Sequence, residues 1–317
     1  MSISKYQCGD PVLDEAIEKT DTSALPDNVV EAIRTATYNS TKSATSVVKE
    51  TADEKIKEHA ISCIKQGRWI DALENRDNDV NWKACLQGLS ETTYSFLFRS
   101  LTDSLPTNSN LARWDKLSSS GCKRCGAEKE SLMHVLNHCP RSLSRYKWRH
   151  DNILVILDKF VKSNIPNAEV RCDVVVSDNK VMTDSHKDTV PPDILITNLR
   201  PDLTVIDRGQ RKIVIVELTV PFERNFIAAK ERKADKYAPL LAGLEEGGYM
   251  CKYFSLELGA RGIASNGTFK TLKSITGATR KSVCDLMKNL SQTVIKCSYV
   301  IFRAKDCDDP CFDFIFT

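Results

Sequence analysis

The stretch RPDLTVIDRGQRKIVIVELTVPFE, residues 200–223, indicates the fold of the second half of the chain. Two runs rich in Val and Ile flank a short polar segment whose residues are typical of a turn. If residues 208–211 form the loop, the chain makes a β-hairpin in which Asp207 faces Lys212. The same register, continued along both strands, brings Asp202 opposite Glu217 at the open end of the hairpin.

Two carboxylates in this position need a neighbouring cation. Opposed residues of a hairpin have Cβ atoms ~4.5–5.5 Å apart, and two negative charges this close raise the pKa of one carboxyl. A hard divalent ion, which prefers oxygen ligands, would remove the conflict. A slip of one residue would instead send the two side chains to opposite faces. A plainer interpretation has Asp202 capping a turn and Glu217 pairing with an arginine.

Lysines follow the hairpin at helical spacing. Pro221 ends the second strand, and residues 222–244 are expected to form a long helix. Lys233 and Tyr237 lie four residues apart and therefore share a helix face, with Lys236 beside them. A lysine near a metal-bound water can polarise a scissile phosphate while the metal lowers the pKa of the water. This composition favours metal-dependent phosphodiester hydrolysis, and the alternative is a solvated helix face.

The remaining elements follow from hydrophobic periodicity. Strands are expected at residues 170–176, 193–199, 202–207, 211–220 and 250–258, and helices at residues 151–163, 222–244 and 279–296. Upstream, residues 53–98 have helical apolar spacing with a polar break at 75–79, and residues 101–110 are typical of a linker or turn. Residues 1–60 hold eleven acidic and seven basic side chains and favour short helices. Helices first and an α/β half second predict two regions of different class.

A compact group of metal-ligand residues precedes the α/β half. Cys122, Cys125, His134 and Cys139 form the pattern C-x2-C-x8-H-x4-C. Four soft ligands favour a closed, tetrahedral, structural zinc site. His138 is an alternative fourth ligand, and Cys139 is preferred because a thiolate binds zinc more strongly. The alternative to a zinc site is a chance grouping of thiols beside a surface histidine. A knuckle of this size has no core of its own, so we expect chelation to unfold it locally.

Positive charge is concentrated around this pattern, although the whole chain carries only +3. Residues 122–150 hold seven Lys/Arg and two Glu, with Tyr146 and Trp148 among them. Cations contact phosphates and rings stack on bases, so this segment is a candidate nucleic-acid interface. The alternative for the cations is a solvated helix face, and Trp148 itself is better interpreted as a core residue. The candidate phosphate contacts are Lys123, Arg124, Arg141, Arg145, Lys147 and Arg149.

Composition excludes several other classes of protein. No run of ~18 apolar residues occurs, so we expect no membrane span. The first twenty residues lack a basic segment followed by an apolar run, so they are not a secretory signal. Twelve cysteines in such a chain favour reduced thiols plus a metal site over a disulfide framework. We therefore expect an intracellular protein, and nuclear localisation if DNA is its partner.

Several motifs occur in a fixed order over residues 105–305. They are the knuckle followed by Pro140, RYKWRHDNIL (145–154), the RPD, ELTVPFE and ERKADKY segments of residues 200–237, LELGARGIASN (256–266) and, more weakly, SYVIFR (298–303). In this order they resemble the C-terminal part of polyproteins from non-LTR retrotransposons that carry a restriction-enzyme-like endonuclease.

The resemblance implies an α+β chain: a helical N-terminal region, a zinc knuckle, and a PD-(D/E)XK-like nuclease domain whose mixed sheet is flanked by helices. It implies that Asp202 and Glu217 bind Mg²⁺ and that Lys233 is the displaced catalytic lysine, with Tyr237 beside it. Lys236 is the alternative lysine, because Thr219 stands where ordinary restriction nucleases keep theirs. Asp193 is a weaker carboxylate candidate, and Arg261 matches a family arginine without an assigned role.

The expected organisation is a helical region at 1–118, the knuckle with its basic flank at 119–150, the nuclease domain at 151–305 and a tail at 306–317. About 120 residues precede the knuckle, and no aromatic-x-Asp-Asp box occurs, so the chain is not expected to act as a reverse transcriptase by itself. The sequence thus predicts a retrotransposon-derived, Mg²⁺-dependent DNA-nicking enzyme that binds DNA or RNA and works with a reverse transcriptase supplied in trans. The alternative is an inert nucleic-acid-binding protein or a non-functional element fragment.

Overall fold

The computed structural model describes residues 44–63, 76–177, 180–182 and 188–307. The chain divides into two units, residues 1–70 and 71–317. In the first unit, helix α3 (Ala44–Ser62) has a weak apolar period, and Ile56 and Ile61 on it are exposed. The short helices predicted over residues 1–43 and the helical spacing at Ile64 lie outside the described residues.

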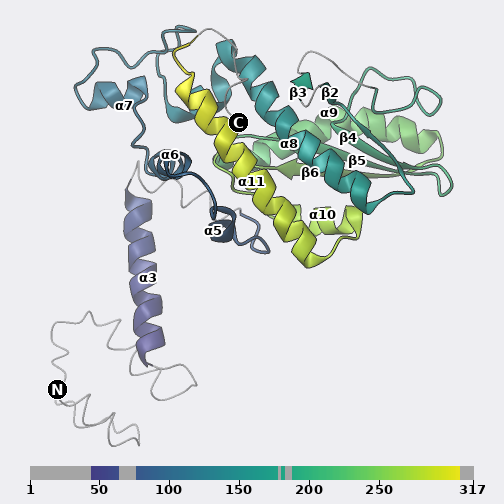
Figure 1. Ribbon diagram of the computed structural model, residues 1–317, viewed down its shortest axis with the longest axis horizontal. Helices are drawn as coiled ribbons and strands as arrows, with labels where there is room; N and C mark the ends of the chain where they lie inside the picture. The colour runs from purple at the N-terminus through teal and green to yellow at the C-terminus, as the bar shows by residue number, and fades with distance from the viewer. Residues whose placement is uncertain (1–43, 64–75, 178–179, 183–187, 308–317) are drawn as a thin grey trace, which may run out of the picture. The chain divides into compact units, whose positions relative to one another are not determined.

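The second unit is built on a mixed four-stranded sheet (Figure 1). Its strands are β1 (Glu169–Cys172), β4 (Leu203–Asp207), β5 (Lys212–Thr219) and β6 (Met250–Glu257), in the order β1-β4-β5-β6. The β1–β4 and β4–β5 pairs are antiparallel, and β6 runs parallel to β5. Helix α9 (Phe226–Glu246) makes the crossover that a parallel pair requires. The expected mixed α+β architecture is therefore confirmed.

The hairpin at the centre of the sheet has the predicted register. Asp207 pairs with Lys212, and Leu203 pairs with Val216. The turn is stabilised by Asp207, whose Oδ1 accepts a hydrogen bond of 2.9 Å from the backbone N–H of Gln210. Both strands are almost wholly buried because helices cover both faces of the sheet.

Alternate residues of the two central strands enter two different cores. Leu203, Val205 and Val216 pack against helix α8 (Leu143–Asn164), helix α10 (Thr268–Thr276) and helix α11 (Arg280–Arg303). The side chains in between, such as Ile206 and Ile213, pack against α9 on the opposite face. This follows from the two-residue period of a strand. Figure 1 shows α8 and α11 on one side of the sheet with α9 on the other.

A third core joins the metal-ligand segment to the helices. Residues Leu132 to Leu136 pack between helix α6 (Glu91–Leu101) and the C-terminal half of α11, around Phe96 and Phe302. Two shorter helices, α5 (Trp82–Cys85) and α7 (Asn108–Arg113), complete this side of the unit. The turn predicted at 101–110 is the link between α6 and α7, although its last three residues already belong to α7. The knuckle thus shares a core with α6 and α11.

Some predicted elements differ from the observed ones. Residues 193–199 are not a strand: Pro191 and Pro192 begin a turn in which the Pro191 carbonyl accepts hydrogen bonds from Ile194 and Leu195. The run 170–176 divides at Asp173 into β1 and β2 (Val175–Ser177), and β2 pairs with β3 (Lys180–Met182) in a small separate sheet.

The three long helices of the α/β half are present but begin or end at other residues than predicted. α8 starts at Leu143 and includes most of the basic flank, so it runs through the boundary predicted at residue 150. α11 continues to Arg303, and α9 starts after a 3-10 turn at Glu223–Asn225. The predicted domain limits remain predictions. None of the described helices combines the length and the apolar character that crossing a membrane requires.

Candidate metal centre and active-site cleft

Two local backbone features bring the four metal-ligand residues together. Cys122 and Cys125 flank a tight loop in which the N–H of Gly126 donates to the Cys122 carbonyl at 2.9 Å. Gly126 has φ +75°, a conformation that glycine adopts without a Cβ clash. His134 and Cys139 lie five residues apart at the ends of a π-helical turn, His134–His138. The i→i+5 bonding of such a turn places both side chains on one side.

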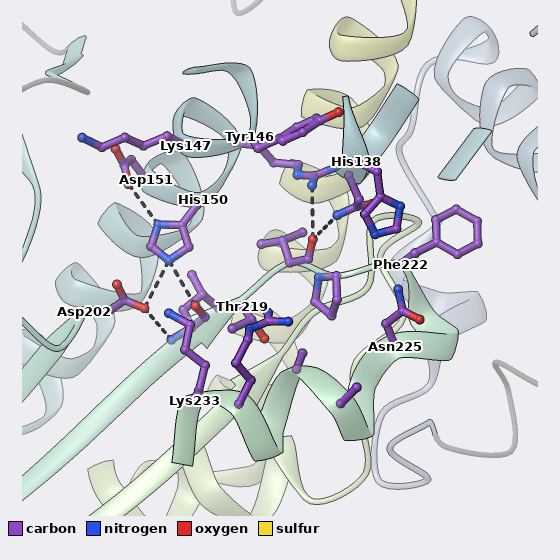
Figure 2. Close-up of a pocket in the computed structure, with 18 of the residues that line it drawn as sticks. His138, Tyr146, Lys147, His150, Asp151, Asp202, Thr219, Phe222, Asn225 and Lys233 are labelled. Carbon is purple, nitrogen blue, oxygen red and sulfur yellow. Dashed lines mark hydrogen bonds and ion pairs between the residues drawn. The ribbon is translucent and has the colours of Figure 1, made fainter. Parts of the chain in front are cut away.

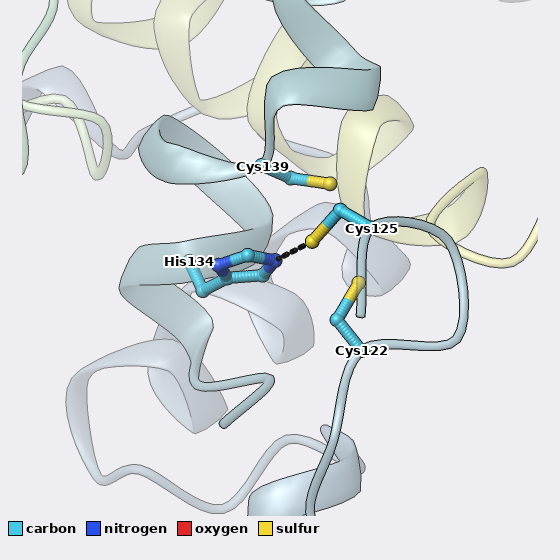
Figure 3. Close-up of side chains that lie close together, drawn as sticks. All are labelled: Cys122, Cys125, His134 and Cys139. Carbon is cyan, nitrogen blue, oxygen red and sulfur yellow. Dashed lines mark hydrogen bonds between the residues drawn. The ribbon is translucent and has the colours of Figure 1, made fainter. Parts of the chain in front are cut away.

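The four ligand atoms all lie within 4.8 Å of one another, as Figure 3 shows. The shortest described contact joins Cys125 Sγ and His134 Nε2 at 3.4 Å. His138 is exposed and does not join this group, so the structure brings Cys139 to the fourth position. Three thiols and one imidazole nitrogen fit tetrahedral zinc, which binds sulfur and nitrogen ligands.

Burial and hydrogen bonding set the protonation of these groups. Burial raises the pKa of the Cys122 thiol to about 11 and lowers the pKa of His134. Burial also opposes ionisation of Cys125, but the backbone N–H of Ala127 and the two neighbouring thiols outweigh it and lower its pKa. A neutral imidazole and a thiol of lowered pKa favour metal binding, and the Cys122 thiol would ionise only with the compensating charge of a metal.

Buried and half-buried polar residues hold the knuckle against the rest of the unit. The Tyr146 hydroxyl donates to the Val135 carbonyl at 2.8 Å and accepts from the Cys139 N–H at 3.0 Å. Buried Glu130 accepts hydrogen bonds from Asn108 and from Lys305 Nζ, the latter at 3.1 Å. The knuckle is thus an integral part of the second unit.

Two of the six candidate phosphate contacts lie inside the protein. Arg149 is 1% exposed and donates to the carbonyls of Leu136 at 3.0 Å and Val220 at 3.2 Å. Arg145 is also buried and donates to the carbonyls of Ala304 and Cys307. Burial lowers the pKa of Arg149 to about 10. The prediction that Arg145 and Arg149 lie on a nucleic-acid-binding surface is therefore wrong for the described structure.

The sequence held a signal for this burial. On α8, the residues at four-residue intervals before Val161 are Leu157, Ile153, Arg149 and Arg145. These four and Val161 are all buried. Residues four apart share one face of a helix. The two arginines thus extend the apolar stripe and satisfy backbone carbonyls where α8 meets the knuckle and α11.

The other four candidate contacts lie at two cavities. Lys123, Arg124 and Arg141 line one of about 600 Å³ together with Asp306. Arg124 is held there by hydrogen bonds of 2.8 Å to the Ser142 hydroxyl and to the Arg141 carbonyl. Lys147 lines a separate cleft, described below. Trp148 is half-buried.

The two hairpin carboxylates, Asp202 and Glu217, lie close together where β4 begins and β5 ends, and we call them the acid pair. The N–H of Asp202 donates to Glu217 Oε2 at 3.1 Å, and the N–H of Leu218 donates to Asp202 Oδ2 at 2.7 Å. Lys233 Nζ forms an ion pair with Glu217 Oε1. Burial and the charge of Asp202 raise the pKa of Glu217. Burial also opposes ionisation of Asp202, but neighbouring His150 and Lys233 outweigh it and lower its pKa.

The structure separates the two candidate lysines. Lys236 is exposed, and its Nζ donates to the Tyr237 hydroxyl at 3.0 Å. Tyr237 is wholly buried and donates to the Arg200 carbonyl at 2.8 Å, just before the Pro-Asp pair. Burial raises the pKa of Tyr237 above its usual value. Lys233 therefore contacts Glu217 of the acid pair directly, while Lys236 contacts Tyr237, which in turn bonds the backbone that leads into Asp202.

The weaker carboxylate candidate lies elsewhere. Asp193 Oδ2 pairs with Arg208 Nη1 at 2.7 Å, and Arg208 also contacts Glu169 at 2.9 Å. These three residues form an exposed ion-pair network at the turn end of the hairpin. Hydrogen bonding to Arg208 lowers the pKa of Asp193.

His150 contacts Asp202 of the acid pair. The sequence analysis did not single it out as a site residue. Its Nε2 lies 3.2 Å from Asp202 Oδ2 and 3.2 Å from the Leu218 carbonyl, and its Nδ1 lies 2.9 Å from Asp151 Oδ1. Burial lowers the pKa of His150, but Asp202 and Asp151 outweigh it and raise the pKa to about 10. The sequence signal was its place in the RYKWRHD segment, which gave the resemblance but no role.

An open cleft of about 730 Å³ connects the acid pair to the knuckle. Figure 2 shows Asp202, His150 and Lys233 at one end, and His138, Phe222 and Asn225 toward the other. The knuckle wall is fixed by Asn137, whose side chain donates to the Val220 carbonyl at 2.7 Å. The C-terminal end of β5 is therefore bonded to the metal-ligand segment.

One known protein family matches the knuckle region. A family model described as zinc-binding in reverse transcriptase matches residues 66–146, about a quarter of the chain. All four clustered ligands lie inside the matched segment. The match and the cluster together support a zinc-binding domain of the kind associated with reverse transcriptases, which suggests a retroelement origin. No curated protein matches the chain.

Proposed function

We propose that this protein is a Mg²⁺-dependent DNA endonuclease of retroelement origin, in which the zinc knuckle forms one wall of the catalytic cleft. The observation that carries the proposal is that Asp202 and Lys233 line one end of that cleft and both contact buried Glu217 directly behind it. The α+β fold with a mixed sheet supports it, since the retroelement nucleases that the sequence resembles have such a sheet.

The donor set at the acid pair fits a hard divalent ion. Oxygen atoms at this end of the hairpin come from Asp202, Glu217 and the Leu218 carbonyl, and Mg²⁺ prefers oxygen ligands. When bound, the ion would lower the pKa of a water and neutralise charge on a phosphate. Lys233 and His150 supply positive charge to the same carboxylates, so the pair is already compensated before a metal binds.

The chain's own residues have distinct tasks in this proposal. Lys233 is partly exposed to the cleft, so its ammonium can both fix Glu217 and stabilise charge on a phosphate. His150 carries a proton on Nε2 and orients Asp202 through it. Tyr237 and Lys236 fix the backbone before Asp202.

Positive side chains on the cleft support DNA as the substrate. Lys147, Arg232 and Lys233 line it, and the cavity with Lys123, Arg124 and Arg141 offers further phosphate contacts. RNA binding, a reverse transcriptase partner in trans and nuclear localisation belong to the same proposal, because a retroelement nick would prime reverse transcription on chromosomal DNA.

A plasmid-nicking assay with Mg²⁺ tests the proposal. We expect the wild type to convert supercoiled DNA to open circles, and Asp202→Asn, Glu217→Gln and Lys233→Met each to lose about 100-fold or more in rate. Asp193→Asn is the matched control, since this exposed carboxylate lies outside the acid pair and should keep the wild-type rate. Equal rates in the wild type and Asp202→Asn, or no nicking in either, would reject catalysis at this site.

The inert alternative predicts a different result with the same purified protein. A folded protein that binds duplex DNA without nicking it would be a binding module. Its affinity should fall with salt at a log–log slope of about −0.9 per neutralised phosphate. The pre-existing pairing of Lys233 and His150 with the carboxylates is the observation that favours this alternative, because the site is electrostatically satisfied without a metal.

A further inference from the structure

Phe222 has an unusual environment at the cleft. It follows β5 in the sequence Val-Pro-Phe-Glu, is half-buried and lines the cleft. The Arg261 guanidinium carbon lies 4.5 Å from the centre of its ring. One side of the ring is thus covered by a cation, while the side chain remains part of the cleft surface.

The arginine that backs the ring is itself fixed. Arg261 is 4% exposed, and its Nε donates to Glu223 Oε2 at 2.8 Å while its backbone N–H donates to Glu223 Oε1 at 2.6 Å. Glu223 is wholly buried, and Gly259 leaves it room, because a Cβ at residue 259 would lie 2.3 Å from Glu223 Cγ.

A buried ion pair costs desolvation and is weak evidence for stability alone. Here it has a positional effect: it holds a guanidinium plane against Phe222, and a cation over a ring adds an attractive contact. The ring is therefore presented to the cleft in a fixed place.

Polar groups accompany the ring. His138 and Asn225 lie with Phe222 away from Asp202, as Figure 2 shows, and all three line the same cleft. His138 stays outside the metal-ligand cluster, so its imidazole is available to a ligand. An aromatic platform with an amide and an imidazole is the chemistry that receives an unpaired base, by stacking on its face and hydrogen bonding to its edge.

We infer that Phe222, backed by Arg261 and Glu223, is the stacking platform of a base-binding subsite that takes an unpaired base of DNA. His138 and Asn225 contact the edge of that base. The inference rests on the proposed function, because it makes the preferred substrate single-stranded or locally opened DNA, with a phosphate near Asp202 and an adjacent base on Phe222.

The test measures binding and not cleavage. Full-length Asp202→Asn protein, which cannot nick DNA in our proposal, is mixed with short oligonucleotides that carry 2-aminopurine, whose fluorescence is quenched by stacking. We expect quenching with single-stranded and bulged DNA and much less with paired duplex. Adding Phe222→Leu should remove the quenching and weaken single-strand affinity about 5- to 150-fold, whereas Phe222→Trp should retain both.

The matched control is Tyr249→Leu. Tyr249 is also a half-buried ring with an arginine over it, Arg211 at 4.9 Å, but it does not line the cleft. The Tyr249→Leu substitution should leave quenching and affinity unchanged. Zinc content and thermal melting of each variant exclude a loss that comes from unfolding.

Three outcomes would overturn the inference. They are no quenching by the protein that retains Phe222, equal quenching with Phe222→Leu, and an equal loss of duplex and single-strand affinity. The first of these needs no Phe222 variant, so the inference stays testable if Phe222→Leu fails to fold. Absence of nicking by the wild type with quenching intact would reject the proposed catalysis and leave the base-binding subsite standing.

Discussion

The Cys/His cluster and the acid pair both gather metal-ligand atoms, but they differ in what compensates them. In the cluster, the ligand atoms of three thiols and an imidazole lie within 4.8 Å of one another, and burial raises the pKa of the Cys122 thiol to about 11. In the acid pair, His150 and Lys233 already contact the two carboxylates. We therefore expect the Cys/His cluster to depend on a bound metal more strongly than the acid pair does.

If both sites bind metal as we propose, this difference would distinguish a structural metal from an exchangeable one within a single unit. A closed set of four soft ligands holds zinc permanently, while a site with internal cations can accept and release a hard ion. Arg149 and Asn137 connect the two regions through the carbonyls of Leu136 and Val220. The predictions below test how far the two regions are independent.

The largest effect should come from removing the zinc ligand Cys125. We expect Cys125→Ser to lose stoichiometric zinc and to expose residues 119–142 to hydrogen exchange, because zinc binding contributes about 10–16 kcal/mol in small zinc domains. Cys251→Ser, at a half-buried thiol of β6, is the control and should keep its zinc. Zinc analysis and exchange mass spectrometry measure both, and one full equivalent of zinc in Cys125→Ser would contradict the assignment.

Arg149→Met should give the next largest effect. Methionine replaces the aliphatic stem but leaves the carbonyls of Leu136 and Val220 without this donor, so we expect the free energy of unfolding to fall by about 2–4 kcal/mol. Urea unfolding measures it. Lys147→Met on the same helix is the control and should change stability by less than about 0.5 kcal/mol. Equal stability of the two variants would show that the link between the regions carries little energy.

His150 should make stability depend on pH in the absence of Mg²⁺. Its pKa is about 10 in the folded protein and ~6.5 in an unfolded chain. The stabilisation is therefore fully present below about pH 6.5 and is lost as the pH rises toward 10. The melting temperature of zinc-loaded wild type should fall across this range more steeply than that of His150→Gln. Parallel profiles would mean that the imidazolium does not compensate Asp202.

The smallest effect should come from Lys236. Because its Nζ contacts the Tyr237 hydroxyl and not the carboxylates, Lys236→Met should change the nicking rate by less than about twofold, against the large loss expected for Lys233→Met. The same plasmid assay compares the two variants. A larger loss for Lys236→Met would reverse the assignment of the lysines.

The sequence predicts features that depend on local spacing. The hairpin register follows from turn chemistry and strand alternation, and the knuckle follows from its ligand spacing. The false strand at 193–199 shows the limit of composition, since Pro191 and Pro192 turn the chain despite the Ile and Leu residues that follow. His150 could not be assigned in this way, because its partner Asp202 lies 52 residues away on another element. Burial of Arg145 and Arg149 required weighing helix periodicity against the usual exposure of arginine.

The π-helical turn at His134–His138 determines which length changes the protein could tolerate. An α-helix has 3.6 residues per turn, so residues five apart point in different directions, and the wider turn corrects this for His134 and Cys139. Deleting one residue between them would restore ordinary helical winding and leave the two ligands four residues apart on one helix face, whereas inserting one residue would rotate Cys139 away from the other three ligands. An insertion before residue 137 would also displace Asn137 from the Val220 carbonyl. Natural variants should therefore accept substitutions in this turn, and the loss of one residue, more readily than insertions.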